Sequence, residues 1–512
     1  MKKIYITTPI YYINAAPHIG HAYTTIAADV LARFYRSQNR EIHFLTGTDE
    51  HGLKIEEAAR ALGLDPKDYA DKISEKFREL WKHLDIRHDD FIRTTEERHT
   101  RCVEEVFGRL LKSGDIYKGF YEGYYCLSCE TYWTEKEILP NEKNLKLCPN
   151  SECRKPLERV KEESYFFKLS KYQDALLSHY QKTPDFLSPS HRASEIVNFV
   201  KAGLQDISVS RAKVKWGIAV PGDPTQTVYV WFDALLNYVS AVFDDRVMNP
   251  SADFWPADIH IVGKEIYRFH AVIWPAMLLA LNFPLPKKVF AHGWWTVEGQ
   301  KMSKSKGNFV DPYEATREFG VDAFRYFLLR EMPFGQDGDF SIEALCRRYN
   351  SDLANDLGNL ISRVVEMTDR FLNGKLPSQS DPEKNDYPKQ WAEKTSAIHV
   401  AMENLNFSEA LSIIWSVISS LNQYVNAQAP WKLQKTSPEK VEPVLFNLVW
   451  SIRIVMGWLE PFMPQTAAKV QSQLGVRQLP RPVTAEEILA GKTAATHEIL
   501  KAPPLFPRKT KA

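Results

Sequence analysis

The 512-residue sequence lacks any long uninterrupted apolar run. Its longest apolar-rich stretch, Val444 to Leu459, is interrupted by Asn447, Ser451 and Arg453. A membrane-spanning helix needs about 20 predominantly apolar residues, so we expect none here. The N-terminus reaches Pro9 too early for the apolar centre of a signal peptide, which predicts a cytoplasmic location.

An excess of charge of one sign is also missing. The chain has 65 Lys and Arg against 64 Asp and Glu, a net charge of +1. Any contact with nucleic acid must therefore come from local basic patches rather than from the overall charge. The composition is that of a globular protein, with 44% hydrophobic and 25% charged residues. The length exceeds that of one ordinary core and predicts two to four domains.

Cysteine is scarce, at six residues, and unevenly placed. Cys102 and Cys346 are isolated, as expected for small buried apolar residues. The other four form a C-x2-C and a C-x4-C pair: Cys126, Cys129, Cys148 and Cys153. Two close pairs suit one closed, structural zinc site with four sulfur ligands. The alternatives are two disulfides, which a reducing cytoplasm disfavours, or four unconnected thiols.

The N-terminal segment has the pattern of a parallel α/β sheet. Lys3 to Thr8 alternates and is β-branched, which predicts a strand. Gly20 to Gln38 repeats apolar residues at four-residue spacing, which predicts a helix, and Glu41 to Leu45 is a second strand. Strand, helix and strand begin a parallel sheet, whose ligands bind beyond the carboxyl ends of the strands.

The motif His18-Ile19-Gly20-His21 lies where the first loop becomes this helix. His18 and His21 are three residues apart and share one face of the first turn. A helix N-terminus attracts phosphate, and two imidazoles there can donate to phosphate oxygens as charge builds in a transition state. Gly20 leaves room for a nucleotide. On this motif alone, two solvated or capping histidines are an equally good interpretation.

A second motif, Lys301-Met302-Ser303-Lys304-Ser305, follows Gly299-Gln300. Two lysines three residues apart on a Ser- and Gly-rich loop make a mobile cationic clamp. Such a clamp can neutralise pyrophosphate as it leaves ATP. The alternative is an ordinary solvated basic loop.

The two motifs, in this order and with the cysteine-rich segment between them, resemble the signatures of class I aminoacyl-tRNA synthetases, and among them of the methionyl-tRNA synthetases. The resemblance extends from Ile6 to about Pro464. It implies a Rossmann-type catalytic domain split by a zinc-bearing connective insertion, then an α-helical bundle that binds the anticodon. The implied reaction joins L-methionine to ATP as methionyl-adenylate and passes methionine to the terminal adenosine of tRNA(Met).

The resemblance also implies domain boundaries. We expect the catalytic domain at residues 1–117 and 223–350, the insertion at 118–222, the helical domain at 351–490 and a tail at 491–512. The insertion is too short to hold the editing domain of the isoleucine, valine and leucine enzymes. A cysteinyl enzyme would hold zinc near its signature histidines, whereas these cysteines lie in the insertion.

For ATP, the resemblance implies a set of catalytic residues and a set of binding residues, with Mg2+ accompanying the nucleotide. The catalytic residues are His18, His21, Lys301 and Lys304. The binding residues are Gly20, Gly263, Glu265, His292, Met302, Ser303 and Ser305.

For methionine, three segments resemble the walls of the family's side-chain pocket. The residues implied are Pro9, Ile10, Tyr12, Asp49, Trp231, Ala234, Leu235, Tyr238, Ile266, His270 and Trp274. Sulfur beside aromatic rings is favoured by roughly 0.3–1.5 kcal/mol, which suits a thioether. His270 and Tyr12 are candidates to hydrogen-bond the sulfur, a weak acceptor. Asp49 would pair with the α-ammonium group, although Glu50 is a second candidate and any single aromatic residue can be plain core.

The C-terminal third is helical in pattern. Apolar residues from Leu411 to Val425 step by three and four residues, and a helix there should end before Pro430. With Val444 to Leu459 as a second helix, a bundle is expected. The resemblance implies that Asn359, Arg363 and Trp431 read the anticodon, since unpaired bases can stack on an exposed aromatic ring. The alternatives are a core tryptophan and a surface pair.

The family's additional dimerising domain is not found in this sequence, so a monomer is expected. Two other functions stay open. Nucleotidyltransferases that act on coenzyme precursors also carry H-x-G-H, but they are shorter and lack a helical third. A non-catalytic RNA-binding protein derived from a synthetase predicts broken motifs, whereas His18, His21, Lys301 and Lys304 are all in place.

Overall fold

The computed structural model describes residues 3–126, 131–133, 135, 138, 145–150, 153–244, 249–297, 299–301, 310–375, 387–474 and 498–510. The chain forms two compact units, each assembled from several segments. Unit 1 contains Met1–Ala16, His43–Glu79 and His88–Ala291. Unit 2 contains Pro17–Ile42, Leu80–Arg87 and His292–Ala512.

A six-stranded sheet in the order β3-β2-β1-β14-β15-β7 is the centre of unit 1. Its strands are β1 (Ile4–Tyr12), β2 (Ile42–Asp49), β3 (Asp90–Arg93), β7 (Leu187–Ser188), β14 (Ile259–Gly263) and β15 (Val289–His292). The pairs β2–β3, β1–β14 and β15–β7 are parallel. The strand order reverses between β1 and β14. In open α/β sheets ligands bind beyond the carboxyl ends of the strands at such a point.

The predicted insertion begins as an antiparallel ribbon of β4 (Ile116–Cys126) and β6 (Glu158–Phe167), which pair along most of their length. The strands β5 (Thr131–Trp133) and β8 (Ile207–Ser208) extend this ribbon to four strands. The edge strand β7 also falls in the range predicted for the insertion, yet it pairs with β15 of the central sheet. Part of that range therefore belongs to the central sheet.

Two smaller sheets complete the strands of unit 1. They are formed by β9 (Ser210–Arg211), β10 (Ala219–Val220) and β11 (Asp223–Val228), and by β12 (Phe243–Asp244) and β13 (Asn249–Pro250). The helices are α2 (Leu53–Ala61), α3 (Pro66–His83, whose last turn belongs to unit 2), α4 (Glu97–Ser113), α5 (Gln173–Lys182), α6 (Ser190–Lys201), α7 (Val230–Leu235), α8 (Asn237–Ser240) and α9 (Trp274–Ala280). One continuous apolar core joins strands β1, β2, β14 and β15 to α4–α9.

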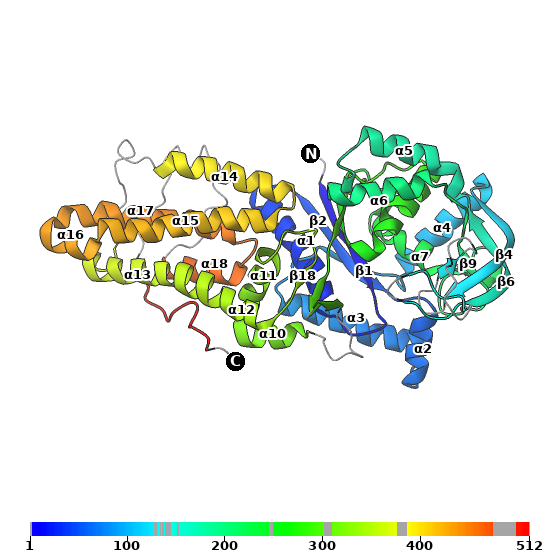
Figure 1. Ribbon diagram of the computed structural model, residues 1–512, viewed down its shortest axis with the longest axis horizontal. Coiled ribbons are helices and arrows are strands. Elements are labelled where there is room, and N and C mark those ends of the chain that lie inside the picture. Colours follow the sequence, from blue (N-terminus) through cyan, green and yellow to red (C-terminus); the bar gives the residue numbers. More distant parts are fainter. Residues whose placement is uncertain are drawn as a thin grey trace. The chain divides into compact units, whose positions relative to one another are not determined.

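Unit 2 begins with the long helix α1 (Ile19–Ser37) and is otherwise mostly helical. Its other helices are α10 (Pro312–Phe319), α11 (Val321–Arg330), α12 (Ile342–Arg348), α13 (Asn359–Leu372), α14 (Tyr387–Glu403), α15 (Phe407–Gln428), α16 (Pro430–Thr436), α17 (Val441–Leu459) and α18 (Pro464–Gln473), with a π-helical segment at Tyr349–Gly358. Figure 1 shows α13, α15 and α17 running alongside one another. The parallel sheet and this bundle confirm the predicted fold class.

The apolar helix of the bundle is the one segment among the described residues whose length and composition suit a bilayer, Pro438–Leu459. In its most apolar window 67% is buried within the protein. It packs against α13 and α15 and is a core helix of the bundle, as the pattern from Val444 onward predicts.

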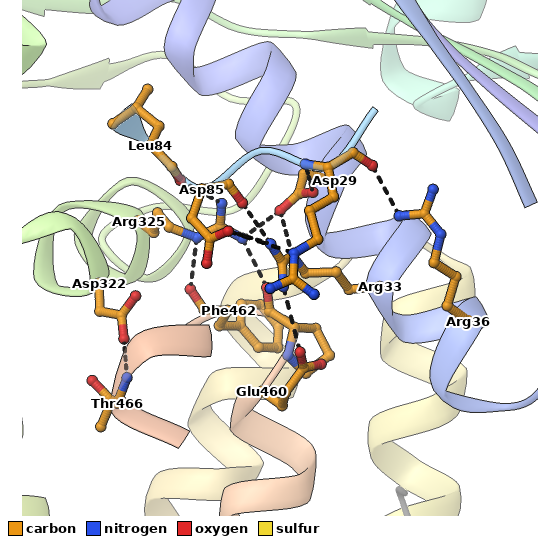
Figure 2. A network of polar contacts seen from close by, with 12 residues as sticks. Asp29, Arg33, Arg36, Leu84, Asp85, Asp322, Arg325, Glu460, Phe462 and Thr466 are labelled. Atoms are coloured by element: carbon orange, nitrogen blue, oxygen red, sulfur yellow. Dashed lines mark hydrogen bonds and ion pairs between the residues drawn. The ribbon is translucent and has the colours of Figure 1, made fainter. Parts of the chain in front are cut away.

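A buried polar network holds α1 within unit 2 (Figure 2). Asp29, one turn before Arg33 on α1, accepts hydrogen bonds from Arg33 Nε at 2.8 Å and Arg325 Nη2 at 2.7 Å. Arg325 also donates to the main-chain oxygens of Pro461 and Phe462, at 2.9 and 3.0 Å. The helix that begins with the histidine motif is therefore tied to α11 and to the turn that ends α17.

Candidate functional site

The two histidines of the first motif cap the N-terminus of α1. His18 is the N-cap residue with extended backbone, and its Nδ1 accepts a hydrogen bond from the Gly20 N–H at 3.0 Å. In return, His21 Nδ1 accepts from the His18 N–H at 3.2 Å. The two rings stack with centroids 3.8 Å apart. The capping alternative raised by the sequence is thus part of the structure.

This capping assigns the tautomer of both rings. A ring nitrogen that accepts from a backbone N–H carries no proton, so each neutral imidazole bears its proton on Nε2. Burial, with a smaller effect of His18, holds the pKa of His21 well below its usual range and keeps the ring neutral. Capping and phosphate binding are therefore compatible, because the cap uses Nδ1 of each ring and leaves its Nε2–H to donate to a phosphate oxygen.

Gly20 is required by the cap itself. A Cβ atom at this position would lie 2.8 Å from Cε1 and 3.0 Å from Nδ1 of the His18 ring. Any side chain would push His18 off the helix terminus. The sequence suggested room for a nucleotide, and the structure adds that the glycine makes room for the histidine.

His292 lies beside the first turns of α1 in unit 2. Its Nε2 is 2.7 Å from Thr24 Oγ1, and its ring meets the Tyr23 ring edge-on at 5.2 Å. Its Nδ1 lies 2.7 Å from the Gly293 carbonyl oxygen, an obligate acceptor, so Nδ1 carries the proton. Within unit 2, His292 thereby contacts the helix that carries Gly20 and His21.

The second motif starts on a small three-stranded sheet of unit 2. Its strands are β16 (Trp295–Val297), β17 (Gln300–Lys301) and β18 (Gly338–Asp339), and Lys301 pairs with Thr296. Lys301 is thus placed at the end of a hairpin that starts three residues after His292. Met302, Ser303, Lys304 and Ser305 lie outside the described residues.

In unit 1, several residues predicted for methionine contact one another. The Tyr238 hydroxyl lies 2.7 Å from His270 Nε2, and the Tyr238 and Trp274 rings lie 5.8 Å apart. Trp231 stacks on Phe269 with centroids 3.9 Å apart. Leu235 and Ile266 pack in the same core, and Ala234 is buried. The second and third predicted segments therefore meet.

The protonation of His270 follows from its two contacts. Nδ1 lies 3.0 Å from the Ile266 carbonyl oxygen and must donate to it. Nε2 then accepts from the Tyr238 hydroxyl. Burial lowers the pKa of His270 to about 4, so the ring is neutral at neutral pH. A hydrogen bond from His270 to a thioether sulfur would need a different arrangement from the one seen here.

The first predicted segment ends β1, where Pro9 is buried and Ile10 and Tyr12 are half-buried. The Ile13 N–H donates to the Asp49 carbonyl oxygen at 3.2 Å, which brings the turn after Tyr12 to the end of β2. Lys54 Nζ lies 5.8 Å from the centre of the Tyr12 ring. Asp49 itself is 8% exposed.

Glu50 is committed to another partner. Its fully buried carboxylate accepts hydrogen bonds from Arg93 Nε at 2.7 Å and Nη2 at 2.9 Å. Thr48 and Thr95 donate to the same carboxylate at 2.7 and 2.6 Å. A bidentate pair of this kind leaves no capacity for a ligand ammonium group. Of the two candidates from the sequence, the geometry favours Asp49.

Gly263 ends β14 and Glu265 follows it, on the strand that lies next to β1 across the point where the strand order reverses. A Cβ atom on Gly263 would collide with the Glu265 carboxylate. The glycine therefore lets this carboxylate fold back over the strand end.

The residues predicted to read the anticodon gather on α13 and α16. The Arg363 guanidinium lies 5.6 Å from the centre of the Trp431 ring and donates to Asn426 Oδ1 at 2.9 Å. Trp431 is 40% exposed, which removes the alternative that it belongs to the core. A groove of about 630 Å³ is lined by Arg363 and Trp431, and an adjoining hollow of about 530 Å³ by Asn359.

Three of the four paired cysteines converge. The sulfur atoms of Cys126, Cys148 and Cys153 all lie within 4.8 Å of one another, and those of Cys126 and Cys153 are 3.5 Å apart. Zinc–sulfur bonds of about 2.3 Å in a tetrahedron separate two sulfur atoms by about 3.8 Å, so the spacing fits. None of these three is in a disulfide. Cys129 lies outside the described residues.

Sequence reasoning missed two groups of buried polar contacts that involve or adjoin the predicted methionine residues. Asp233 contacts both His51 and His99, which are 182 and 134 residues away in the chain. His260 accepts from Trp274 Nε1 at 3.2 Å and lies 2.6 Å from Thr7 Oγ1. His51 lies in the segment Gly47–Gly52 at the end of β2, but no pattern in the neighbouring sequence indicates that Asp233 is its partner.

Comparisons with known proteins agree with this geometry. Residues 4–365 match the family described as tRNA synthetases class I (M), and residues 377–510 match the anticodon binding domain of methionyl tRNA ligase. The chain is 49% identical to methionine–tRNA ligase of Caldanaerobacter subterraneus subsp. tengcongensis, over 99% of this chain and 79% of that protein. It is 46% identical to the Thermotoga maritima ligase, over 98% and 80%.

Solved structures give the same result. The methionyl-tRNA synthetase of Mycobacterium tuberculosis in complex with methionyl-adenylate superimposes with a TM-score of 0.92 at 39% identity. That match covers 99% of this chain and 100% of the other. The apo form of the same enzyme matches with a TM-score of 0.85 at 36% identity.

Proposed function

The chain belongs to the methionyl-tRNA synthetase family of class I aminoacyl-tRNA synthetases, and we propose that one set of its residues acts on ATP and another binds methionine. The protein activates L-methionine with ATP and transfers it to the 3′-terminal adenosine of tRNA(Met). The observation that carries the proposal is the double histidine cap on α1, which fixes two Nε2 donors at a helix N-terminus.

In the first step an oxygen of the methionine carboxylate attacks the α-phosphorus of ATP. The bond from that phosphorus to the bridging oxygen breaks, and pyrophosphate leaves. Negative charge grows on the phosphate oxygens, where His18 and His21 donate hydrogen bonds and the N-terminus of α1 adds its dipole. Lys301 and Lys304 neutralise the pyrophosphate. Mg2+, if bound with ATP, would supply further charge neutralisation.

In the second step a ribose hydroxyl of the terminal adenosine attacks the carbonyl carbon of the adenylate, and AMP leaves. We assign the contacts with ATP to seven residues in the first motif, at the ends of β14 and β15, and in the second motif. They are Gly20, Gly263, Glu265, His292, Met302, Ser303 and Ser305.

For the amino acid we assign Asp49 to the α-ammonium group. The side chain is assigned to Pro9, Ile10, Tyr12, Trp231, Ala234, Leu235, Tyr238, Ile266, His270 and Trp274. The close packing of Tyr238, His270 and Trp274 and the neutral state of His270 support an apolar, uncharged environment, which suits a thioether.

Substituting Asp49→Asn should raise the methionine KM at least about tenfold and leave the ATP KM within about twofold. A charge-assisted hydrogen bond to the ammonium group is worth roughly 1.5–3 kcal/mol. ATP–pyrophosphate exchange at varied methionine and ATP measures both constants. Glu57→Gln on α2, an exposed position, removes the same charge as a control. An unchanged methionine KM in Asp49→Asn would show that another group holds the ammonium.

We also propose one structural zinc ion held by Cys126, Cys129, Cys148 and Cys153. The fit of three sulfur atoms and the turn from Asn150 to Cys153 and Arg154, closed by two backbone hydrogen bonds, support it. When bound, the ion would join the carboxyl end of β4, through Cys126, to the turn that carries Cys148 and Cys153 and precedes β6.

Purified protein should contain about one zinc per chain, and Cys148→Ser should lose most of it, because a tetrahedral site with three ligands binds far more weakly. Elemental analysis after dialysis gives the content. Cys346→Ser, a buried cysteine outside the cluster, is the matched control. Zinc contents near zero in the unsubstituted protein would exclude the site.

For the anticodon we propose Asn359, Arg363 and Trp431. Substituting Trp431→Ala should reduce the rate of tRNA charging at limiting tRNA by roughly tenfold, since base stacking is worth about 1–3 kcal/mol. ATP–pyrophosphate exchange should stay nearly unchanged. Trp431→Phe keeps an aromatic face and should retain most of the charging rate. Equal losses of charging and exchange would remove the anticodon role.

The monomeric state and the cytoplasmic location expected from the sequence stay predictions. Sedimentation of the purified chain and localisation of a tagged chain test them.

A further inference from the structure

Asp233 is a fully buried charge that the proposed chemistry does not use. It lies on the short helix α7, between Trp231 and Ala234, and is 0% exposed. Burial alone would raise the pKa of its carboxyl group, but His51 and His99 outweigh burial and lower that pKa to about 2. A buried carboxylate is costly unless every oxygen is paired, so its partners define its role.

Each carboxylate oxygen of Asp233 has one imidazole partner. Oδ2 lies 2.7 Å from His51 Nδ1, and Oδ1 lies 2.6 Å from His99 Nε2. An ionised carboxylate only accepts, so both ring nitrogens donate. On its other side, His99 Nδ1 lies 2.8 Å from Ser240 Oγ of α8. Asp233 is thus the centre of a chain of side-chain contacts, called the relay below, that runs from His51 after β2 through Asp233 to His99 of α4 and Ser240 of α8.

The His51 side of this relay holds the loop Asp49–Gly52. The His51 ring also meets the Trp216 ring edge-on at 5.6 Å, and Trp216 Nε1 donates to the Glu50 carbonyl oxygen at 2.5 Å. The Gly52 N–H donates to the Trp216 carbonyl oxygen at 3.0 Å. Together with the pair of Glu50 and Arg93, these contacts fix the loop on both sides.

The Asp233 side holds α7, which needs such support. The helix has six residues and no side-chain cap at its N-terminus. Helices this short have little stability of their own, so tertiary contacts must set their position. Trp231, Ala234 and Leu235 on this helix are the side-chain contacts assigned above.

We propose that Asp233 is a positioning residue which, through His51, fixes the loop carrying Asp49 against helix α7, so that the ammonium and side-chain anchors of methionine keep one spacing. This inference rests on the methionine assignment made above. Methionine is bound at two points, its ammonium group and its side chain, so a tie between the two parts of the protein that bind them makes the two contacts act together.

The test compares four substitutions by ATP–pyrophosphate exchange and by equilibrium binding of two probes. Asp233→Asn neutralises the relay, and His51→Leu removes its donor. His51→Asn keeps an N–H near the position of Nδ1. His99→Gln keeps a donor near the position of Nε2 and does not contact the loop. The probes are L-methionine and 3-(methylthio)propanoate, which keeps the thioether but lacks the ammonium group.

Asp233→Asn and His51→Leu should raise the methionine KM at least about fivefold and leave the ATP KM within about twofold. They should also weaken the preference for methionine over 3-(methylthio)propanoate by at least about threefold, because the ammonium contact no longer acts with the thioether contact. His51→Asn should recover most of both effects, and His99→Gln should stay within about twofold.

A purely structural relay would behave differently. It would lower the thermal midpoint and kcat with the methionine KM and the probe ratio unchanged, and that result overturns the proposal. Equal increases of the methionine KM in His51→Leu and His99→Gln overturn it as well. If Asp233→Asn fails to fold, His51→Leu decides. Asp49→Asn distinguishes a failure of the methionine assignment from a failure of the positioning role. If Asp49→Asn leaves the methionine KM unchanged, the methionine assignment is wrong. If Asp49→Asn raises that KM and His51→Leu does not, only the positioning role is refuted.

Discussion

Replacing His21 by alanine should lower the rate of ATP–pyrophosphate exchange about a hundredfold. A hydrogen-bond donor aimed at charge that develops only in the transition state is worth about 2.7–4 kcal/mol in other enzymes. Because this contact strengthens as the α-phosphate gains charge, kcat should fall and the ATP KM should change little. Lys304→Ala should act similarly through the leaving pyrophosphate.

In the structure His21 caps α1 through Nδ1. In our proposal it also donates to phosphate through Nε2, and two substitutions separate these roles. His21→Asn places a carbonyl oxygen near Nδ1, so it keeps the cap acceptor and loses the donor. His21→Gln places an amide nitrogen near Nε2, so it keeps the donor and loses the cap. We expect Gln to retain more exchange activity and Asn more helix stability, by about 1 kcal/mol.

The role in phosphate chemistry would be wrong if His21→Asn exchanged pyrophosphate at the unsubstituted rate. The same conclusion would follow if His21→Gln were as inactive as His21→Ala while both retained the natural fold by circular dichroism.

The sequence predicts those features whose cause is local. The strand at the N-terminus, the helix that starts near Gly20 and the helix that ends before Pro430 follow from periodicity and from residues that begin or end helices, and the structure confirms all three. The spacing of Cys148 and Cys153 predicts that these two lie close together, as the structure shows. Each of these signals lies within a few residues of the element it predicts.

Contacts between distant segments could not be predicted in this way. Nothing near Glu50 indicates that Arg93 takes both of its oxygens, and only that pair distinguishes it from Asp49. Similarly, the sequence offered capping or phosphate binding for His18 and His21 as alternatives. The structure shows the cap, and the cap itself specifies the tautomer that phosphate binding needs.

A second large effect is expected at Arg325, in unit 2. Substituting Arg325→Met should lower the free energy of unfolding by about 3–5 kcal/mol, the range found when one partner of a buried ion pair is removed. The Arg325 guanidinium is 0% exposed and donates to Asp29 at 2.7 Å. It also donates hydrogen bonds to the carbonyl oxygens of Leu84, Pro461 and Phe462 (Figure 2). The apolar methionine side chain cannot replace these hydrogen bonds.

Asp29 explains why the loss should be so large. Burial raises the pKa of its carboxyl group, but Arg325 and Arg33 reverse that effect and hold the pKa below its usual value. Without Arg325 the buried carboxylate keeps the Arg87 main-chain N–H at 2.8 Å and a single cation, Arg33, which Asp85 and Glu460 also attract. The carboxylate would then be partly uncompensated in a medium of low polarity, where water cannot reach it.

Urea unfolding followed by circular dichroism measures the loss, with Arg36→Met as the control. Arg36 lies on the same helix, but its contact with the Arg87 carbonyl oxygen is exposed, so its loss should cost less than about 1 kcal/mol. The double substitution Asp29→Leu with Arg325→Met removes both charges and should recover part of the stability, though not all, because the three carbonyl oxygens stay unsatisfied. A loss below about 1 kcal/mol in Arg325→Met would mean that water or a neighbouring cation replaces the guanidinium, and that α1 does not depend on this network.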